Sequence, residues 1–252
     1  MTNGVVRTFD QVAPVYDSVL PFFETAARGF AGVVEPQAGA RVLDLGCGTG
    51  AATAELLARG CDVVAVDAST AMVERLRATY PTVDAHVMDA AALDLPDAAF
   101  DVVVATFVLH LLDDPAAAAR EARRVLRPGG QFAFAMPGPH VDPSIPLDET
   151  IRLFAEYTKY LPPGGSMGAP FDEPAVLAEA GFTEVQERHY TFEVAVPDGN
   201  AFWQFTLTHG TRKFVDDLPA ERRSQFEDEI RALSAFTMTR TVWVYSGLAP
   251  GI

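Results

Sequence analysis

Residues 41–50 read Arg-Val-Leu-Asp-Leu-Gly-Cys-Gly-Thr-Gly, an apolar run that ends in alternating glycines. The run has the length and composition of a buried β-strand, and the Ala/Leu-rich stretch after it, 51–59, is typical of a helix. Gly46 and Gly48 allow sharp turns and let a ligand come close to the backbone. The stretch therefore predicts a strand, a ligand-binding turn and a helix, which is the opening unit of an α/β fold.

The same alternation continues along the chain. Further strands are predicted at 62–66, 83–88, 100–106 and 131–136, with helices at 70–80 and 115–126 between them. Short apolar strands alternating with helices are typical of a parallel sheet covered on both faces. Such sheets bind ligands beyond the carboxyl ends of their strands. We therefore expect a Rossmann-like α/β fold whose site residues follow its strands.

Four segments are expected from the changes in pattern. Residues 1–35 would form an N-terminal helical cap, and 36–136 the cofactor-binding core. Residues 137–170, rich in Pro and Gly around an aromatic helix at 147–161, would be an insertion or lid over the substrate site. Residues 171–252 would complete the sheet and the substrate pocket, with helices at 173–180, 199–214 and 219–235 and strands at 185–194 and 240–245.

Composition excludes several functional classes. The 252 residues carry a net charge of −15, which opposes binding to nucleic acid and disfavours anionic membranes. The hydrophobic content of 49% is that of a globular chain. Two cysteines, no recognisable leader and no apolar run of membrane-spanning length predict a cytoplasmic protein with reduced thiols.

Acidic residues stand at the ends of three predicted strands. Asp67 could accept hydrogen bonds from two ribose hydroxyls. Asp44, beside a G-x-G-x-G loop, would repel a dinucleotide's pyrophosphate but attract an ammonium group. Asp89 and Ala90 could read an adenine edge, and Met72 could lie on the adenine plane, although its spacing alone favours the core. Together these features describe an adenosine that carries an amino-acid tail.

The motifs in this order resemble the class I S-adenosylmethionine-dependent methyltransferases, over about residues 5–137. The resemblance is to the small-molecule branch, which includes ubiquinone/menaquinone and actinobacterial natural-product methyltransferases. The motifs are VLDLGCGTG at 42–50, VDAS at 66–69, MDA at 88–90, FDVVVATFVLHLL at 100–112 and RVLRPGG at 124–130.

The resemblance implies S-adenosylmethionine as cofactor and a seven-stranded sheet with an antiparallel last strand. It implies that Gly46 and Gly48 face the methionine moiety, and that Asp44 and Thr106 lie near its amino group. It implies Asp67, with the adjoining Ala68, on the ribose, and Asp89 with Ala90 on the adenine. Tyr16, in the pattern Phe9-Asp10-x-x-Ala13-x-x-Tyr16-Asp17, would close over the cofactor, although an ordinary packed aromatic remains an alternative.

Catalysis depends on the acceptor. A hydroxyl or an acidic carbon would need a general base, for which His110 and His140 are candidates, each with the alternative of a packed structural histidine. Many relatives have two consecutive histidines where this chain has His110-Leu111. The histidines form no metal-ligating cluster in the sequence.

We expect methyl transfer to a small, hydrophobic or aromatic acceptor by a monomer or homodimer, with O-, N- and C-methylation left open. The alternatives are non-methyl chemistry such as cyclisation, and a non-catalytic cofactor-binding module. The negative net charge argues against a nucleic-acid methyltransferase. An aromatic set in the second half of the chain belongs either to the core or to an apolar substrate pocket: Phe154, Tyr157, Tyr160, Phe171, Phe202, Trp203 and Phe205.

Overall fold

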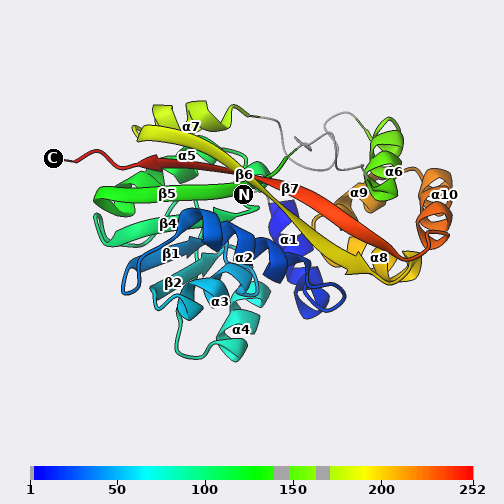
Figure 1. Ribbon diagram of the computed structural model, residues 1–252, viewed down its shortest axis with the longest axis horizontal. Coiled ribbons are helices and arrows are strands. Elements are labelled where there is room, and N and C mark those ends of the chain that lie inside the picture. The colour runs from blue at the N-terminus through cyan, green and yellow to red at the C-terminus, as the bar shows by residue number, and fades with distance from the viewer. Residues whose placement is uncertain (1–2, 139–147, 163–170, 252) are drawn as a thin grey trace.

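The computed structural model describes residues 3–138, 148–162 and 171–251 (Figure 1). These residues form one sheet in the order β3-β2-β1-β4-β5-β7-β6, in which β7 alone runs antiparallel to all the other strands. The expected mostly parallel, seven-stranded sheet is confirmed. Its strands are β1 Arg41–Leu45, β2 Asp62–Asp67, β3 Asp84–Val87, β4 Phe100–Thr106, β5 Leu126–Gly138, β6 Thr183–Val196 and β7 Phe236–Leu248.

Successive residues of a strand point to opposite faces of the sheet, and here both sets are apolar, so helices cover both faces. Val42 and Val104 pack under α2 (Phe22–Val34) and α3 (Ala51–Ala58), while Leu43 and Val103 pack under α5 (Pro115–Val125) and α7 (Glu173–Glu179). Helix α4 (Thr70–Thr79) packs beside β2 and β3. The parallel strands therefore present their carboxyl ends at one edge.

The hairpin of β6 and β7 is longer than the sheet that it joins. Strand β5 pairs with β7 only from Gln131–Leu248 to Gly138–Thr241, whereas β6 follows β7 as far as the pair Val196–Phe236. The projecting part carries a group of helices at one end of the molecule (Figure 1). We call this group the helical module: α6 Glu149–Thr158, α8 Gly199–Thr206, α9 Thr211–Asp217 and α10 Ala220–Arg231.

Three elements differ clearly from their sequence-based expectation. The strand expected at 131–136 runs from Leu126 to Gly138, and the strand expected at 240–245 runs from Phe236 to Leu248. The helix expected at 199–214 is divided, because the Thr206 and Thr208 hydroxyls donate to the Phe202 and Phe205 carbonyls before α9 begins.

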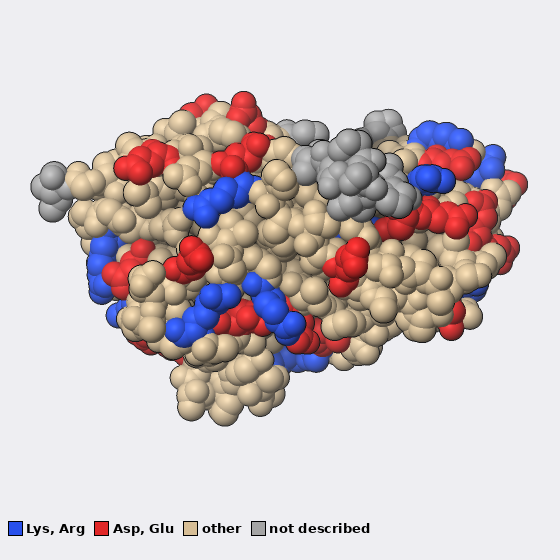
Figure 2. Space-filling model, in the orientation of Figure 1, with Lys and Arg blue, Asp and Glu red and all other residues tan. Residues whose placement is uncertain are grey.

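The N-terminal segment consists of α1 (Asn3–Val12) and a short 3-10 turn, Ala13–Val15, and it lies against α4. Cys47 and Cys61 are both free and buried. Among the described helices, none combines the length and apolar character that crossing a membrane requires. On the face drawn in Figure 2, Lys and Arg side chains of the described residues are scattered between acidic ones rather than gathered in a stripe.

Candidate active site

The glycine loop after β1 is fitted tightly to its surroundings on one side and open on the other. The amides of Gly46 and Cys47 both donate to the carbonyl of Val66, at 2.7 and 3.0 Å. Gly46 has a φ of +73°, and a Cβ there would lie 2.3 Å from Cγ2 of Val108. A Cβ on Gly48, with φ +53°, would meet no atom within 4 Å. The open side at Gly48 is therefore where a ligand can reach the backbone.

Asp67 joins this loop to the start of α4. Its Oδ2 accepts from the Gly48 amide at 2.9 Å, and its Oδ1 accepts from the Ser69 amide at 2.8 Å. Burial raises the pKa of Asp67, while these amides oppose the shift. Each carboxylate oxygen has a further lone pair. The side chain is thus fixed in place and can still accept hydrogen bonds from a ligand's hydroxyls.

Two buried oxygens near the loop lack partners among the described residues. The Thr53 hydroxyl donates to Oδ2 of Asp44 at 2.6 Å, but Oδ1 of Asp44 and Oγ1 of Thr106 have no hydrogen bond. Burial raises the pKa of Asp44 to about 6. Buried polar atoms without partners are uncommon and costly. Both atoms would gain a partner from a ligand's ammonium group.

The N-terminal segment is attached to α4 by polar contacts. Asp10 accepts from the Ser69 hydroxyl at 2.6 Å and from the Ala71 amide at 3.2 Å. Arg75 donates to Asp17 at 2.8 Å. Tyr16 stacks on Phe23 with 4.4 Å between ring centroids, and burial raises the pKa of its hydroxyl. The segment therefore closes one side of the space above the glycine loop.

That space is a small cavity, which we call the inner chamber. Its volume is about 40 Å³, which holds only a few water molecules. A ligand as large as an adenosine therefore requires this chamber to widen. The lining residues are Val6, Phe9, Tyr16, Gly46, Gly48, Asp67, Ser69, Met72, Thr106, Phe107, Val108 and Leu111.

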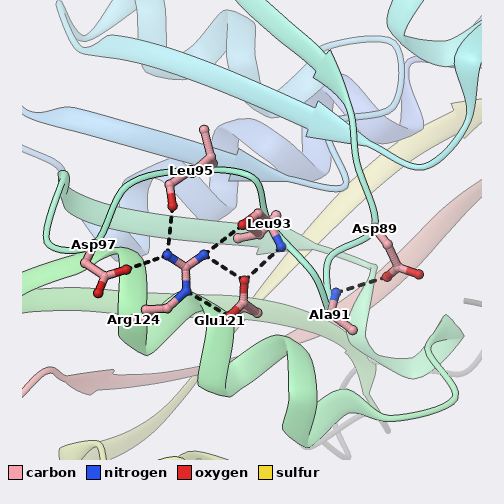
Figure 3. Close-up of polar contacts among 7 residues, drawn as sticks. All are labelled: Asp89, Ala91, Leu93, Leu95, Asp97, Glu121 and Arg124. Carbon is pink, nitrogen blue, oxygen red and sulfur yellow. Dashed lines mark hydrogen bonds and ion pairs between the residues drawn. The ribbon is translucent and has the colours of Figure 1, made fainter.

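The loop after β3 is held by α5 (Figure 3). Asp89 is exposed, and its carboxylate accepts from the Ala91 amide at 3.0 Å. Further along, Arg124 donates to the carbonyls of Leu93 and Leu95 at 2.8 and 2.7 Å. Glu121 accepts from the Leu93 amide at 2.8 Å. This cluster fixes the path of the loop that carries Asp89.

A second, larger cavity of about 340 Å³ lies between the sheet and the helical module. Four residues line both cavities: Phe9, Tyr16, Phe107 and Leu111. The two spaces therefore adjoin at these residues, which we call the neck. The wall of the larger cavity is mainly aromatic and aliphatic, as is typical of sites for small organic molecules. It includes Phe22, Phe23, Phe154, Phe202 and Phe205 together with His110, His209 and Arg240.

The two histidines of the larger cavity are held in the neutral form. Burial lowers the pKa of both His110 and His209 to about 4. Nδ1 of His209 lies 2.8 Å from the carbonyl of Phe205, which can only accept, so this nitrogen carries the proton. Nδ1 of His110 is buried and has no partner in the described part of the chain.

The structure brings most of the sequence-predicted cofactor residues together. Tyr16, Gly46, Gly48, Asp67, Met72 and Thr106 line the inner chamber. Asp44 lies behind the loop, while Ala68, Asp89 and Ala90 are outside the lining set. His110 lies on the larger cavity, and His140 lies outside the described residues.

Sequence reasoning did not single out the cavity role of Phe22, Phe23, Thr211 or Arg240, because no local pattern marks them. Of the aromatic set in the second half, Phe154, Phe202 and Phe205 line the larger cavity, whereas Tyr157 and Trp203 are buried in the core.

Known proteins resemble this chain in sequence and in fold. A family model described as "Methyltransferase domain" matches residues 43–134. Nocamycin O-methyltransferase from Saccharothrix syringae is 33% identical, over 90% of this chain and 90% of its own length.

Two solved structures share the fold. Phosphoethanolamine N-methyltransferase 2 from Haemonchus contortus, in complex with S-adenosyl-L-methionine, matches with a TM-score of 0.57 at 16% identity, over 99% of this chain and 57% of that one. The cyclase SpnF matches with a TM-score of 0.54 at 19% identity, over 91% and 82%. From the family match and the full-length relative, the chain belongs to the S-adenosylmethionine-dependent methyltransferases.

Proposed function

We propose that this enzyme transfers the methyl group of S-adenosylmethionine to an oxygen atom of a small, largely aromatic acceptor bound in the larger cavity. The observation that carries the proposal is the neck, where an aromatic cavity of about 340 Å³ adjoins the glycine-loop chamber. Transfer to oxygen is favoured by the similarity to nocamycin O-methyltransferase over 90% of both chains.

The cofactor would be held by the residues of the inner chamber. Asp67 would accept from the ribose hydroxyls, and the unpaired oxygens of Asp44 and Thr106 would meet the amino group of the methionine moiety. Gly48 leaves room for the backbone of that moiety. Asp89 and Ala90 would contact the adenine, and Met72 would pack against it. Tyr16 would cover the cofactor from the neck.

The bound cofactor supplies a methyl group already activated by its sulfonium. The protein's task is then to orient the acceptor, exclude water and hold its nucleophilic atom at the neck. Phe107 and Leu111 shape that passage, while Phe22 and Phe205 present ring surfaces to an aromatic acceptor.

His110 is the proposed general base for a hydroxyl acceptor. Its ring is on the cavity wall next to Leu111 of the neck, and burial keeps it neutral above about pH 5, with its pKa lowered to about 4. A neutral imidazole nitrogen can accept the hydroxyl proton as the oxygen attacks. A carboxylate acceptor is already ionised and would not need this step.

The deciding experiment measures S-adenosylhomocysteine release with a panel of small phenols and aromatic acids. We expect release with at least one acceptor, together with a product heavier by one methylene. Calorimetric titration with S-adenosylmethionine in parallel reports cofactor binding by itself. Cofactor binding without transfer to any acceptor that the cavity binds would contradict the proposal.

The alternative is non-methyl chemistry in the same cavity. The cyclase SpnF has this fold, which shows that the fold alone does not fix the reaction. In that case a bound substrate would be converted without formation of S-adenosylhomocysteine, and the product would have the same mass as the substrate.

A further inference from the structure

One side chain of the larger cavity has no part in the proposed transfer of the methyl group. Arg240 on β7 lines this cavity, and it is the only Lys or Arg among the described residues on its wall. Its side chain is 23% exposed. A guanidinium among aromatic rings is costly unless its donors are satisfied. Its hydrogen bonds therefore indicate what it can bind.

One part of the guanidinium is fixed by protein groups. Nη1 donates to the carboxylate of Asp148 and, at 2.8 Å, to the carbonyl of Thr239. Nη2 donates to the Thr150 hydroxyl at 2.8 Å. Asp148 and Thr150 are themselves almost completely buried at the start of α6. The orientation of the guanidinium plane is therefore set before any ligand arrives.

The remaining edge has no protein acceptor. In the part of the chain that the structure describes, nothing accepts from Nε–H of Arg240, and Nη2 has one acceptor for its two N–H groups. On a guanidinium, Nε–H and the neighbouring Nη2–H form the fork that binds both oxygens of a carboxylate. The unused edge thus has the donor geometry for a two-oxygen anion.

The positive charge of Arg240 is only partly compensated by Asp148. Asp148 caps α6, and its Oδ1 accepts from the amides of Thr150 and Ile151 at 3.1 and 3.3 Å. Its Oδ2 also accepts from the Thr239 amide at 3.3 Å. The negative charge is therefore shared with the amino end of the helix, whose dipole is positive. This leaves Arg240 able to attract a second anion.

Arg240 lines only the larger cavity, whereas the neck residues line both cavities. A molecule bound at Arg240 would therefore reach the methyl donor with another of its atoms. We propose that Arg240 anchors a carboxylate of the methyl acceptor, so that the acceptor is an aromatic acid methylated at a site remote from that carboxylate. This inference rests on the proposed function, because it concerns the acceptor of the same reaction.

The test compares a matched pair of probes, 2-naphthoate and its neutral amide 2-naphthamide, titrated into the full chain saturated with S-adenosylhomocysteine. We expect the acid to bind at least about tenfold more tightly than the amide, the effect of a charge-assisted bidentate contact. Equal affinity, or no measurable binding of either probe up to its solubility limit, would overturn the proposal.

Variants identify the residue responsible. R240Q should abolish the preference for the acid, because it weakens binding of the acid far more than binding of the amide. R240K keeps a positive charge beside Asp148 but lacks the fork, so it should lose most of the preference. R222Q is the control, because Arg222 of α10 lies over the Tyr160 ring and does not line the cavity. An R240K or R240Q protein that retained the full preference would refute the anchor.

R240Q leaves the buried Asp148 without its cation, so the double variant R240Q/D148N is used if the single variant does not fold. The same samples separate this inference from the proposed function. A protein that binds S-adenosylmethionine and methylates neutral acceptors, yet shows no preference for the acid, refutes the anchor alone. A protein that prefers the acid but never releases S-adenosylhomocysteine refutes methyl transfer alone.

Discussion

Asp67 and Gly48 are joined by a hydrogen bond of 2.9 Å, which ties the end of β2 to the glycine loop after β1. Because the other oxygen of Asp67 binds the Ser69 amide at 2.8 Å, a single carboxylate holds two turns at a fixed separation. The inner chamber lies between these turns, so its shape depends on this side chain.

Replacing Asp67 by Ala should raise the Kd for S-adenosylmethionine by about tenfold or more, since charge-assisted hydrogen bonds contribute about 1.5–3 kcal/mol. Calorimetric titration measures the effect. Asp62→Ala is the matched control, because Asp62 starts the same strand and its side chain is 71% exposed. An Asp67→Ala protein with wild-type affinity would show that Asp67 does not contact the cofactor.

Gly46→Ala should destabilise the protein and weaken cofactor binding strongly. The new Cβ would lie 2.3 Å from Val108 Cγ2, in a backbone region with φ +73°. Gly39→Ala separates the two causes, because φ is +81° there but nothing lies within 4 Å. The double variant Gly46→Ala/Val108→Ala should recover part of the lost stability. Thermal melting provides the comparison, and equal losses for the two glycine variants would exclude the steric explanation.

Stability should depend on pH through Asp44. Its pKa is raised by burial to about 6, above the value near 3.8 of an exposed carboxyl. Between these values the native state binds more protons than the unfolded state, so this group lowers the free energy of unfolding as pH rises from about 4 to 6. The cost at neutral pH is about 2–3 kcal/mol.

Asp44→Asn removes that cost while weakening recognition of the ammonium group. The difference in melting temperature between the variant and the wild type should therefore grow in the variant's favour between pH 4 and pH 7, and cofactor affinity should fall. A difference that is constant with pH would mean that Asp44 titrates normally.

His110→Ala should lower kcat by about 100-fold or more with a hydroxyl acceptor, the usual contribution of a general base. The Kd for S-adenosylmethionine should stay near the wild-type value, because His110 lies outside the inner-chamber lining. Since its pKa is lowered to about 4, the wild-type rate should show no loss from protonation of His110 between pH 6 and 8. His189→Ala, at an exposed position on β6, is the control. With a carboxylate acceptor, His110→Ala should remain active, because no proton has to be removed.

Asp10→Ala should speed up cofactor association. Asp10 holds the N-terminal segment to α4 through the Ser69 hydroxyl and the Ala71 amide. The chamber below is too small for the cofactor, so we expect this segment to move outward when the cofactor enters. Stopped-flow fluorescence gives the association rate. Hydrogen exchange of the amides of α1 should be faster in the variant, and unchanged exchange together with an unchanged rate would refute this opening.

The sequence alone predicted that Gly46, Asp67 and Thr106 would lie at one edge of the sheet. Gly46 follows β1, while Asp67 and Thr106 end β2 and β4, so their proximity follows from the parallel sheet. The length of β7 was underestimated, although Thr stands at every second position from Thr237 to Thr241, which is the two-residue period of a strand.

The residues of the larger cavity could not be predicted from the sequence in the same way. Phe22, His209 and Arg240 come from three distant segments, and they meet because the β6–β7 hairpin projects past β5 and carries the helical module. Their positions depend on tertiary packing rather than on a local period. The pairing of Arg240 with Asp148 joins residues far apart in the chain and leaves no spacing that a sequence pattern could reveal.

The hairpin that projects past β5 also has a consequence for how such enzymes diversify. Everything between Val196 and Phe236 is inserted at the far tip of two paired strands, and no cofactor-chamber residue comes from it. The sequence of this stretch can therefore change during evolution and alter which acceptors bind, while the residues of the cofactor chamber stay the same. Grafting the equivalent stretch from a relative offers a direct route to new acceptors.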